Sequence, residues 1–358
     1  MTNISPNSKK IKRFPLKTLG ISLVVLAVLF SVFYLFKNGN NEKSDTRLVV
    51  GWQTAWATAG QIIETLDHTN ITTLYGSSAT FRNFLYGPDM IEAGLGGDID
   101  ATTLGIVPII SLLAINDDWT VVCRLIDFST TTIAKDGSGI ETFADIKGKK
   151  LGVPFGASGA YPYILLRMEE NGMTTQNTKL VNVSPAEAIV VLQQGGIDAL
   201  GIWEPTSTII ESKGIGKVID EKRYIGFVAV KRNLVENNPD EVVALIKSLI
   251  EANWYVVQNR KQTDEWFAKR SNFDLDLLNK IRIIEPNLKA QSVENISVTI
   301  SQEDIALSQQ VADQMLASDL LPRKVNFAER VNNELAKQAT EEIRKAGSKI
   351  NQVILKGE

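Results

Sequence analysis

One pattern of prolines, glycines and apolar residues occurs twice in this chain, over residues 87–108 and again over residues 184–205. In each copy a proline suits the start of a helix, a glycine pair suits its end, and an apolar run suits a buried strand. Two such α/β units predict two lobes, with a ligand cleft between them. The matching positions are Pro88 and Pro185, Gly96-Gly97 and Gly195-Gly196, Ile99-Asp100-Ala101 and Ile197-Asp198-Ala199, and Pro108 and Pro205.

Length and composition narrow the class of protein. A chain of 358 residues suits two domains, and 44% hydrophobic residues can fill sizeable cores. The net charge of −3, without a basic stripe, argues against a nucleic-acid partner. The single cysteine, Cys123, excludes an internal disulfide and a cysteine-based zinc site, and the single histidine, His68, stands in a polar segment. We therefore predict no metal and no cofactor.

The first 46 residues form a separate region. Basic residues within residues 1–17 precede an uncharged, largely apolar run over residues 18–36, and residues 37–46 are polar. Nineteen residues in a helix span roughly 28 Å, close to the hydrocarbon thickness of a bilayer. We expect a cytoplasmic basic segment, a transmembrane anchor and a linker, with the remainder outside the cytoplasm. A cleaved signal, which would leave a secreted or periplasmic protein, is the alternative, although the run ends without a small-x-small cleavage site.

Alternating strands and helices follow, and they predict an α/β fold with mostly parallel sheets. We expect residues 47–132 to form the first part of lobe 1, residues 133–222 to form lobe 2, and residues 223–358 to return to lobe 1 as C-terminal helices. Hinge crossings are expected near residues 132–135 and 222–230. The expected strands are 48–52, 71–75, 120–125, 130–134, 150–154 and 224–230, and the expected helices outside the repeats are 59–66, 143–146, 161–171, 240–258, 264–269, 274–284, 302–317 and 327–345.

Taken in order, several motifs resemble those of the nitrate/sulfonate/taurine branch of solute-binding proteins, which serve ABC importers and are related to thiamine-precursor binders. The resemblance covers about residues 47–285. It implies a two-lobed periplasmic-binding-protein type II fold, an ABC permease as partner, and a small anionic or zwitterionic organic ligand such as a sulfonate, taurine or nitrate. A pyrimidine thiamine precursor is the alternative ligand. The motifs are Leu48-Val49-Val50-Gly51-Trp52-Gln53, Gly87-Pro88, Gly105-x-x-Pro108, residues 143–153, Gly156-Ala157-Ser158 and Trp203-Glu204-Pro205.

The corner at Gly156, Ala157 and Ser158 joins a predicted strand to a predicted helix. Small residues there let backbone N–H groups approach an anion, the helix dipole adds attraction, and the Ser158 hydroxyl can donate. In the family this corner commonly holds the ligand's head group, and a histidine often follows it. Here Tyr161 stands near that place. A plain glycine-rich turn is the alternative interpretation.

Trp203 and Glu204 end the strand of the second repeat, and ligands of α/β sheets bind beyond the carboxyl ends of strands. Trp203 can stack on the ligand. Glu204 can either pair with an amine of the ligand or cap the helix that Pro205 begins.

The equivalent edges of lobe 1 carry mostly hydroxyl and amide groups, which suit a small polar ligand held by neutral hydrogen bonds. Arg82 can clamp an oxyanion or form an exposed salt bridge. The first tryptophans, Trp52 and Trp56, can line the cleft, although ordinary packing is expected for at least one of them. The other candidates from this lobe are Gln53, Thr54, Ser78, Thr80 and Thr103.

Enzymes also occur on this fold, so the fold alone does not exclude catalysis. Their chemistry relies on histidine, cysteine or acid–base pairs, and the predicted cleft offers none of these. We therefore predict a binding protein and not an enzyme. A ligand sensor is the third reading, which the lack of a recognisable signalling segment after the binding fold disfavours.

Overall fold

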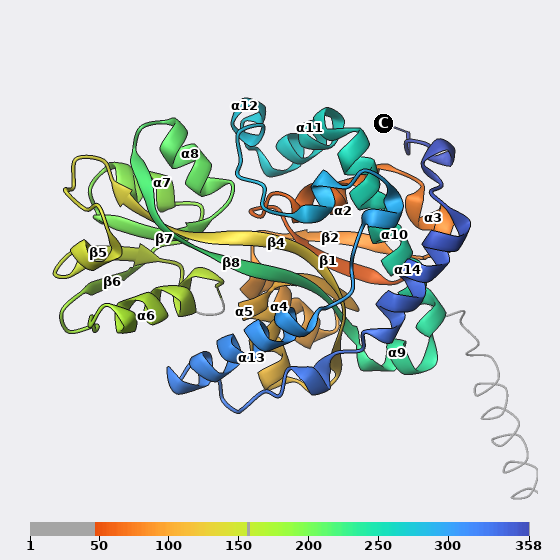
Figure 1. Cartoon of the computed structure of the whole chain (residues 1–358), viewed down its shortest axis with the longest axis horizontal. Coiled ribbons are helices and arrows are strands. Elements are labelled where there is room, and N and C mark those ends of the chain that lie inside the picture. Colours follow the sequence, from red (N-terminus) through yellow and green to blue (C-terminus); the bar gives the residue numbers. More distant parts are fainter. Residues whose placement is uncertain (1–46, 156–157, 358) are drawn as a thin grey trace, which may run out of the picture. The chain divides into compact units, whose positions relative to one another are not determined.

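Eight strands form one mixed sheet in the part of the chain that the computed structural model describes, residues 47–155 and 158–357 (Figure 1). Their order is β2-β1-β3-β8-β4-β7-β5-β6. β1 pairs in parallel with β2 and β3, and β5 pairs in parallel with β6 and β7, so the α/β class with a mostly parallel sheet is confirmed. The strands are β1 (Val49–Gln53), β2 (Thr80–Phe84), β3 (Ala101–Gly105), β4 (Trp119–Lys135), β5 (Lys150–Val153), β6 (Lys179–Asn182), β7 (Ala199–Trp203) and β8 (Gly216–Lys231).

Two long antiparallel strands join the parallel groups. β4 and β8 pair from Trp119↔Lys231 to Lys135↔Gly216, and at opposite ends β8 also pairs with β3 and β4 with β7. The expectation of separate strands at 120–125 and 130–134 was wrong. The chain stays extended through Asp127, because that polar residue is paired with Arg223 of the neighbouring strand and does not end the sheet.

Helices cover the sheet on both sides (Figure 1), and the two repeats have the predicted helix–strand–helix order, α4-β3-α5 and α7-β7-α8. The helices are α2 (Ala59–His68), α3 (Ile71–Tyr75), α4 (Gly87–Gly96), α5 (Ile106–Ile115), α6 (Ala160–Glu170), α7 (Ala188–Gln193), α8 (Thr206–Ser212), α9 (Arg232–Asn237), α10 (Pro239–Gln258), α11 (Arg260–Ser271), α12 (Leu275–Leu278), α13 (Gln302–Ala317) and α14 (Glu334–Ala346); short 3-10 turns include Phe143–Ile146 and Ala328–Arg330.

Other expected elements also differ from the observed ones, and the strand expected at 224–230 begins at Gly216. Residues 71–75 are helical and not a strand, because Ile71 and Tyr75, four positions apart, are buried on one helix face. Gly76 ends that helix with a φ of 79°, a left-handed conformation that glycine adopts easily. The helix expected at 274–284 is limited to α12, and the one expected at 327–345 begins only at Glu334.

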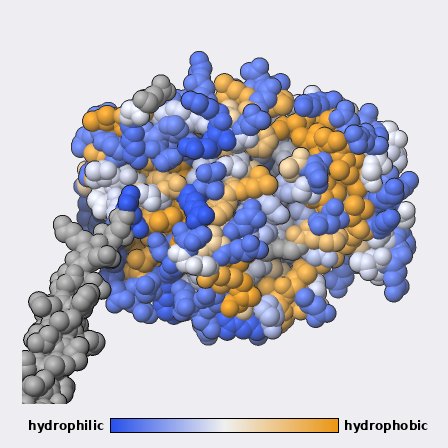
Figure 2. All heavy atoms as spheres, turned by 180° about the vertical axis from the view of Figure 1, so that it is seen from behind, coloured by the Kyte–Doolittle hydropathy of each residue, from blue (hydrophilic) through white to orange (hydrophobic). Residues whose placement is uncertain are grey.

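The core contains large apolar side chains from both ends of the sheet. The face in Figure 2 carries hydrophilic residues interspersed with hydrophobic ones, whereas Trp52, Trp119, Tyr163 and Phe227 are almost completely buried. Of the C-terminal helices, α10 packs against α2, α3 and α14. However, α13 contacts both α5 and α6, and Gln314 Nε2 donates to the Pro162 carbonyl at 3.2 Å.

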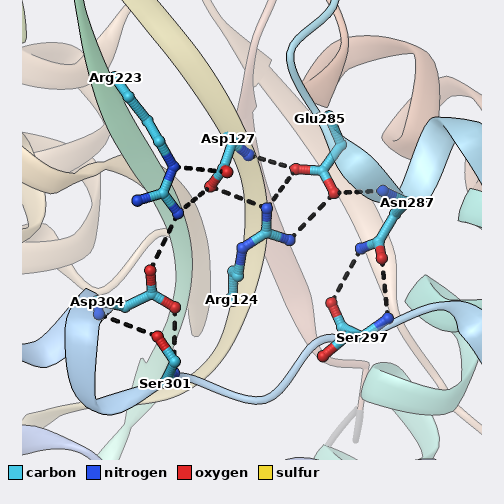
Figure 3. Close-up of polar contacts among 8 residues, drawn as sticks. All are labelled: Arg124, Asp127, Arg223, Glu285, Asn287, Ser297, Ser301 and Asp304. Carbon is cyan, nitrogen blue, oxygen red and sulfur yellow. Dashed lines mark hydrogen bonds and ion pairs between the residues drawn. The ribbon is translucent and has the colours of Figure 1, made fainter.

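A buried ionic network fastens the C-terminal segment to the two long strands (Figure 3). Arg124 of β4 donates from Nη1 to Glu285 Oε1 at 3.1 Å and from Nη2 to Oε2 at 2.5 Å. The same guanidinium lies 2.8 Å from Asp127 Oδ1, and Asp127 accepts from Arg223 of β8 at 2.6 Å. Arg223 also reaches Asp304 at the start of α13, 3.1 Å away. The carboxylate of Glu285 is completely buried, so these partners offset the cost of removing it from water.

None of the helices in residues 47–155 and 158–357 is long and apolar enough to cross a membrane. The predicted basic segment 1–17, anchor 18–36 and linker 37–46 lie outside the described residues.

We predict that Glu285→Gln lowers the free energy of unfolding by about 3 to 5 kcal/mol, because it leaves Arg124 buried with only one carboxylate partner. Denaturant unfolding followed by circular dichroism measures the loss. Glu341→Gln is the matched control, since Glu341 forms a long, exposed ion pair with Lys345 at 3.9 Å and should change stability by less than about 1 kcal/mol. Equal effects of the two substitutions would contradict a stabilising role for the network.

Candidate ligand-binding site

A cavity lies where α4, α5 and α6 begin. About 360 Å³ of space, part of which opens to the solvent, is unfilled by protein atoms. It is lined by Gln53, Trp56, Tyr86, Gly87, Gly105, Pro108, Phe128, Ser158, Gly159 and Trp203.

Three of the lining residues are helix N-caps. Tyr86 precedes α4, Gly105 precedes α5 and Gly159 precedes α6. None of the three supplies a side-chain hydrogen bond that caps its helix. The first-turn N–H groups of a helix have no partner within the helix, and the helix dipole places partial positive charge there. Three such ends at one cavity favour a negatively charged group.

Aromatic side chains form much of the wall. The ring of Phe128 lies edge-on to Trp56, with ring centroids 5.0 Å apart and planes at 71°. A Cβ atom at Gly105 would stand 3.1 Å from Phe128 Cζ, so glycine is needed for the ring to lie this close to the backbone. Gly105, a glycine of the first repeat, therefore makes room for the Phe128 ring in addition to preceding α5.

Trp203 connects two distant parts of the sheet across the cavity. Its indole Nε1 donates to the carbonyl oxygen of Ala55 at 3.2 Å. Trp203 ends β7, whereas Ala55 lies between β1 and α2. This hydrogen bond joins the parallel group of β7 to the parallel group of β1.

Trp56 also carries an indole N–H donor, but its surroundings differ from those of Trp203. Its side chain is only 3% exposed, and a Cβ atom at Gly226 of β8 would lie 2.5 Å from Trp56 Cη2, so the indole rests directly on that strand. Among the described residues, Trp56 Nε1 has no hydrogen-bond partner. Two buried hydroxyls behind the wall, those of Thr130 and Tyr224, also lack partners there.

The lining residues carry no ionisable side chain except the phenol of Tyr86. Within residues 47–155 and 158–357, no group of three or more histidine, cysteine or acidic residues could hold a metal ion. The described lining of the cavity therefore offers neutral donors, helix N-termini and aromatic surfaces.

Four residues considered from the sequence line the cavity, namely Gln53, Trp56, Ser158 and Trp203. Gln53 Nε2 donates to the Thr103 carbonyl at 3.4 Å, which places its amide at the cavity wall. We expected the Ser158 hydroxyl to donate to a ligand, but it donates to the carbonyl of Pro154. Its oxygen lone pairs remain available as acceptors.

Trp52, Thr54 and Thr103 were also predicted as site residues, but they do not line the cavity. Trp52 is 2% exposed and packs in the core, because side chains alternate between the two faces of a strand. The hydroxyls of Thr54 and Thr103 donate to backbone carbonyls of Phe84 and Gly51, each at 3.1 Å.

Ser78, Thr80 and Arg82 lie outside the cavity. Ser78 and Thr80 stand at the amino end of β2, whereas the cavity lies at the carboxyl ends of β1 and β3. Arg82 forms an exposed salt bridge with Asp98 at 3.0 Å, which is the alternative considered for it above.

The remaining predictions concern lobe 2. Gly156 and Ala157 lie outside the described residues. Tyr161 packs against Phe155, with ring centroids 4.8 Å apart, and lines a separate surface hollow. Glu204 is buried beneath α8, where its carboxylate accepts from the Thr208 hydroxyl at 3.0 Å and from the Thr208 N–H at 3.1 Å. It thus caps the helix, and burial raises its pKa above the ordinary value.

Residue-by-residue reasoning missed Tyr86, Phe128 and Gly159 as lining residues. Phe128 falls in the segment that was read as a break between two strands. One sequence pattern could have indicated them. Before each of α4, α5 and α6, a strand is followed by a glycine or an aromatic residue and then by the helix.

Comparison with known proteins supports the resemblance proposed from the motifs. The model of the NMT1-like family matches residues 47–270. A putative aliphatic sulfonates-binding protein of Bacillus subtilis (strain 168) is 26% identical over 283 residues, which are 75% of this chain and 80% of that protein. The crystal structure of the periplasmic aliphatic sulphonate-binding protein SsuA from Escherichia coli superposes with a TM-score of 0.67 at 23% identity, covering 80% of this chain and 92% of that one.

The same fold also occurs in an enzyme. The desulfurization enzyme DSZB superposes with a TM-score of 0.59 at 15% identity, covering 83% of this chain and 99% of the enzyme. At such identity the likeness shows the fold alone.

Sheet, repeats and cavity together define the fold of periplasmic solute-binding proteins, as expected from the sequence. The chain belongs to the NMT1-like family.

We predict that Glu204→Ala lowers the free energy of unfolding by about 0.5 to 2 kcal/mol, because α8 loses its cap. Glu204→Gln is the control, since its amide oxygen keeps one acceptor and should retain part of that stability. Chemical unfolding of both variants checks this. If Glu204→Ala is as stable as the unmodified protein, the carboxylate has no capping role.

Proposed function

We propose that this protein is the extracytoplasmic solute-binding component of an ABC importer. Its ligand is a small anionic or zwitterionic organic solute of the sulfonate, taurine or nitrate kind, held in the cavity described above. The observation that carries this proposal is the meeting of three uncapped helix N-termini at a cavity without charged side chains. The sulfonate-binding relatives agree with it.

The residues of the cavity favour binding over catalysis. Acyl transfer, hydrolysis and related reactions need a nucleophile or an acid–base pair within reach of the substrate. The lining residues include no histidine, cysteine or carboxylate. Cys123 is buried in β4, and burial raises the pKa of its thiol, which keeps it protonated and unreactive.

We infer further that residues 47–132 and 223–358 form one lobe and residues 133–222 the other. The two crossings then run along β4 and β8, whose long pairing provides a continuous connection. The hydrogen bond from Trp203 to Ala55 closes the cleft from one lobe to the other.

The proposal includes attachment to the membrane through the N-terminal region. Residues 18–36 anchor the protein in the cytoplasmic membrane, residues 1–17 remain inside, and residues 37–46 tether the binding domain close to its permease. A flexible ten-residue tether has a root-mean-square length of about 17 Å, so the domain stays near the bilayer surface.

Calorimetric titration with butanesulfonate, taurine and nitrate tests ligand binding. We expect saturable binding of at least one of them. Gly159→Ala should weaken it by about 1 to 3 kcal/mol, since the added Cβ would stand 3.9 Å from Phe128 at the cavity wall and occupy ligand space. Gly96→Ala is the control, because a Cβ atom there meets nothing within 4 Å and lies outside the lining. Failure of all three compounds to bind the unmodified protein would overturn the proposed solute class.

Membrane attachment is tested separately. We expect the mature protein to sediment with membranes and to retain residues 18–36, because that apolar run has spanning length and no cleavage site. Fractionation followed by intact-mass analysis decides the matter. A soluble mature protein that begins near residue 37 or later would show that the segment is a cleaved signal.

A further inference from the structure

We propose that the indole N–H of Trp56 is the side-chain donor that binds the ligand's anionic head group, and that the site selects oxyanions with an uncharged apolar remainder. This inference rests on the proposed function and specifies the ligand class within it. Its basis is a contrast between two tryptophans of the same cavity.

The donor of Trp56 is buried and has no hydrogen-bond partner among the described residues. Leaving a buried N–H unpaired is unfavourable, and native proteins rarely do so without a compensating partner. The indole cannot easily turn to find one, because it rests on Gly226 and also contacts the ring of Phe128. A ligand oxygen in the cavity would provide the missing acceptor.

Trp203 is already paired. Its Nε1 donates to Ala55, 3.2 Å away, so this tryptophan supplies an aromatic surface and a contact across the cleft. Of the two cavity tryptophans, therefore, Trp56 alone has a donor to offer a ligand.

The surroundings of Trp56 specify the charge of the ligand. The N-caps of α4, α5 and α6 line the same cavity, so partial positive charge surrounds the place where an acceptor would sit. A head group that stays ionised and has only hydrogen-bond acceptors, such as a sulfonate, matches these donors. The lining has no carboxylate to pair with an ammonium group, so a zwitterion such as taurine gains nothing from its positive end.

The remaining walls specify the rest of the ligand. Phe128, Pro108 and the ring of Trp203 present apolar surface, and the glycines at the helix starts add no polar side chain. A short alkyl or aryl group attached to the oxyanion would bury its surface there. Nitrate, which has no such group, would leave this surface unused.

The substitution Trp56→Phe tests the assignment, because it removes the N–H and keeps an aromatic ring against Gly226 and Phe128. A hydrogen bond to a charged acceptor predicts a loss of butanesulfonate affinity of about 10-fold to 100-fold by calorimetry. Trp119→Phe is the matched control, a buried tryptophan of β4 outside the cavity that should leave affinity unchanged. Unfolding midpoints of both variants are measured alongside.

A second readout separates hydrogen bonding from shape. In a protein with ¹⁵N-labelled indoles, the Trp56 N–H resonance, assigned by its absence in Trp56→Phe, should move downfield when butanesulfonate is added. The Trp203 resonance should move less, since its partner is a carbonyl of the chain. Butanesulfonate should also bind more tightly than taurine or nitrate.

The outcomes are distinct. If the unmodified protein binds butanesulfonate and Trp56→Phe binds it equally well, or the Trp56 resonance does not respond, the assignment of Trp56 is overturned while the proposed function stands. Tighter binding of taurine or nitrate than of butanesulfonate overturns the inferred ligand class. If none of the three binds the unmodified protein, the proposed function and this inference both fail.

Discussion

The pairing of β4 with β8 is the constraint on which the rest of the structure depends. These two strands link the parallel group β2-β1-β3 with the parallel group β7-β5-β6, and both groups contribute residues to the cavity. Phe128, which lines the cavity, and Gly226, on which the Trp56 indole rests, come from the middle of this pair. A change in the β4–β8 register would therefore displace the floor of the site as well as the connection between its sides.

Irregularities in the pairing of β4 with β8 bring charged side chains together. Side chains three positions apart in a regular strand point to opposite faces, yet Arg124 and Asp127 lie 2.8 Å apart. A register shift between Arg124 and Ile126 accounts for this, since a bulge changes which face the following residues occupy. The two residues can then join Glu285 and Arg223 in one network, which fixes the C-terminal segment beside the strands that build the cavity (Figure 3).

Much of this architecture could be predicted from the sequence because helix and strand limits depend on local residues. The prolines and glycine pairs of the two repeats place α4, β3, β7 and α8 close to where they occur. The same rules mistook residues 71–75 for a strand, since β-branched residues there favour a strand locally while burial of Ile71 and Tyr75 requires a helix. Burial in the folded protein therefore determines the helical structure of residues 71–75.

The site was less predictable because its geometry depends on contacts between distant segments. Gln53 and Trp203 could be chosen as residues at the carboxyl ends of strands. By contrast, Ser78 and Thr80 have suitable chemistry but stand at the amino end of β2, and Phe128 lines the cavity only because glycines far along the chain leave room for its ring. Sequence patterns indicate which residue types are available, and packing decides which of them line the cavity.

The most direct test of this account is a crystal structure of the protein grown with butanesulfonate, with the ligand's sulfur located by its anomalous signal. The account predicts the sulfur at the starts of α4, α5 and α6, with a sulfonate oxygen in hydrogen-bond range of Trp56 Nε1 and the alkyl chain against Phe128. A sulfur bound elsewhere, or a head group turned away from the three helix N-termini, would contradict it.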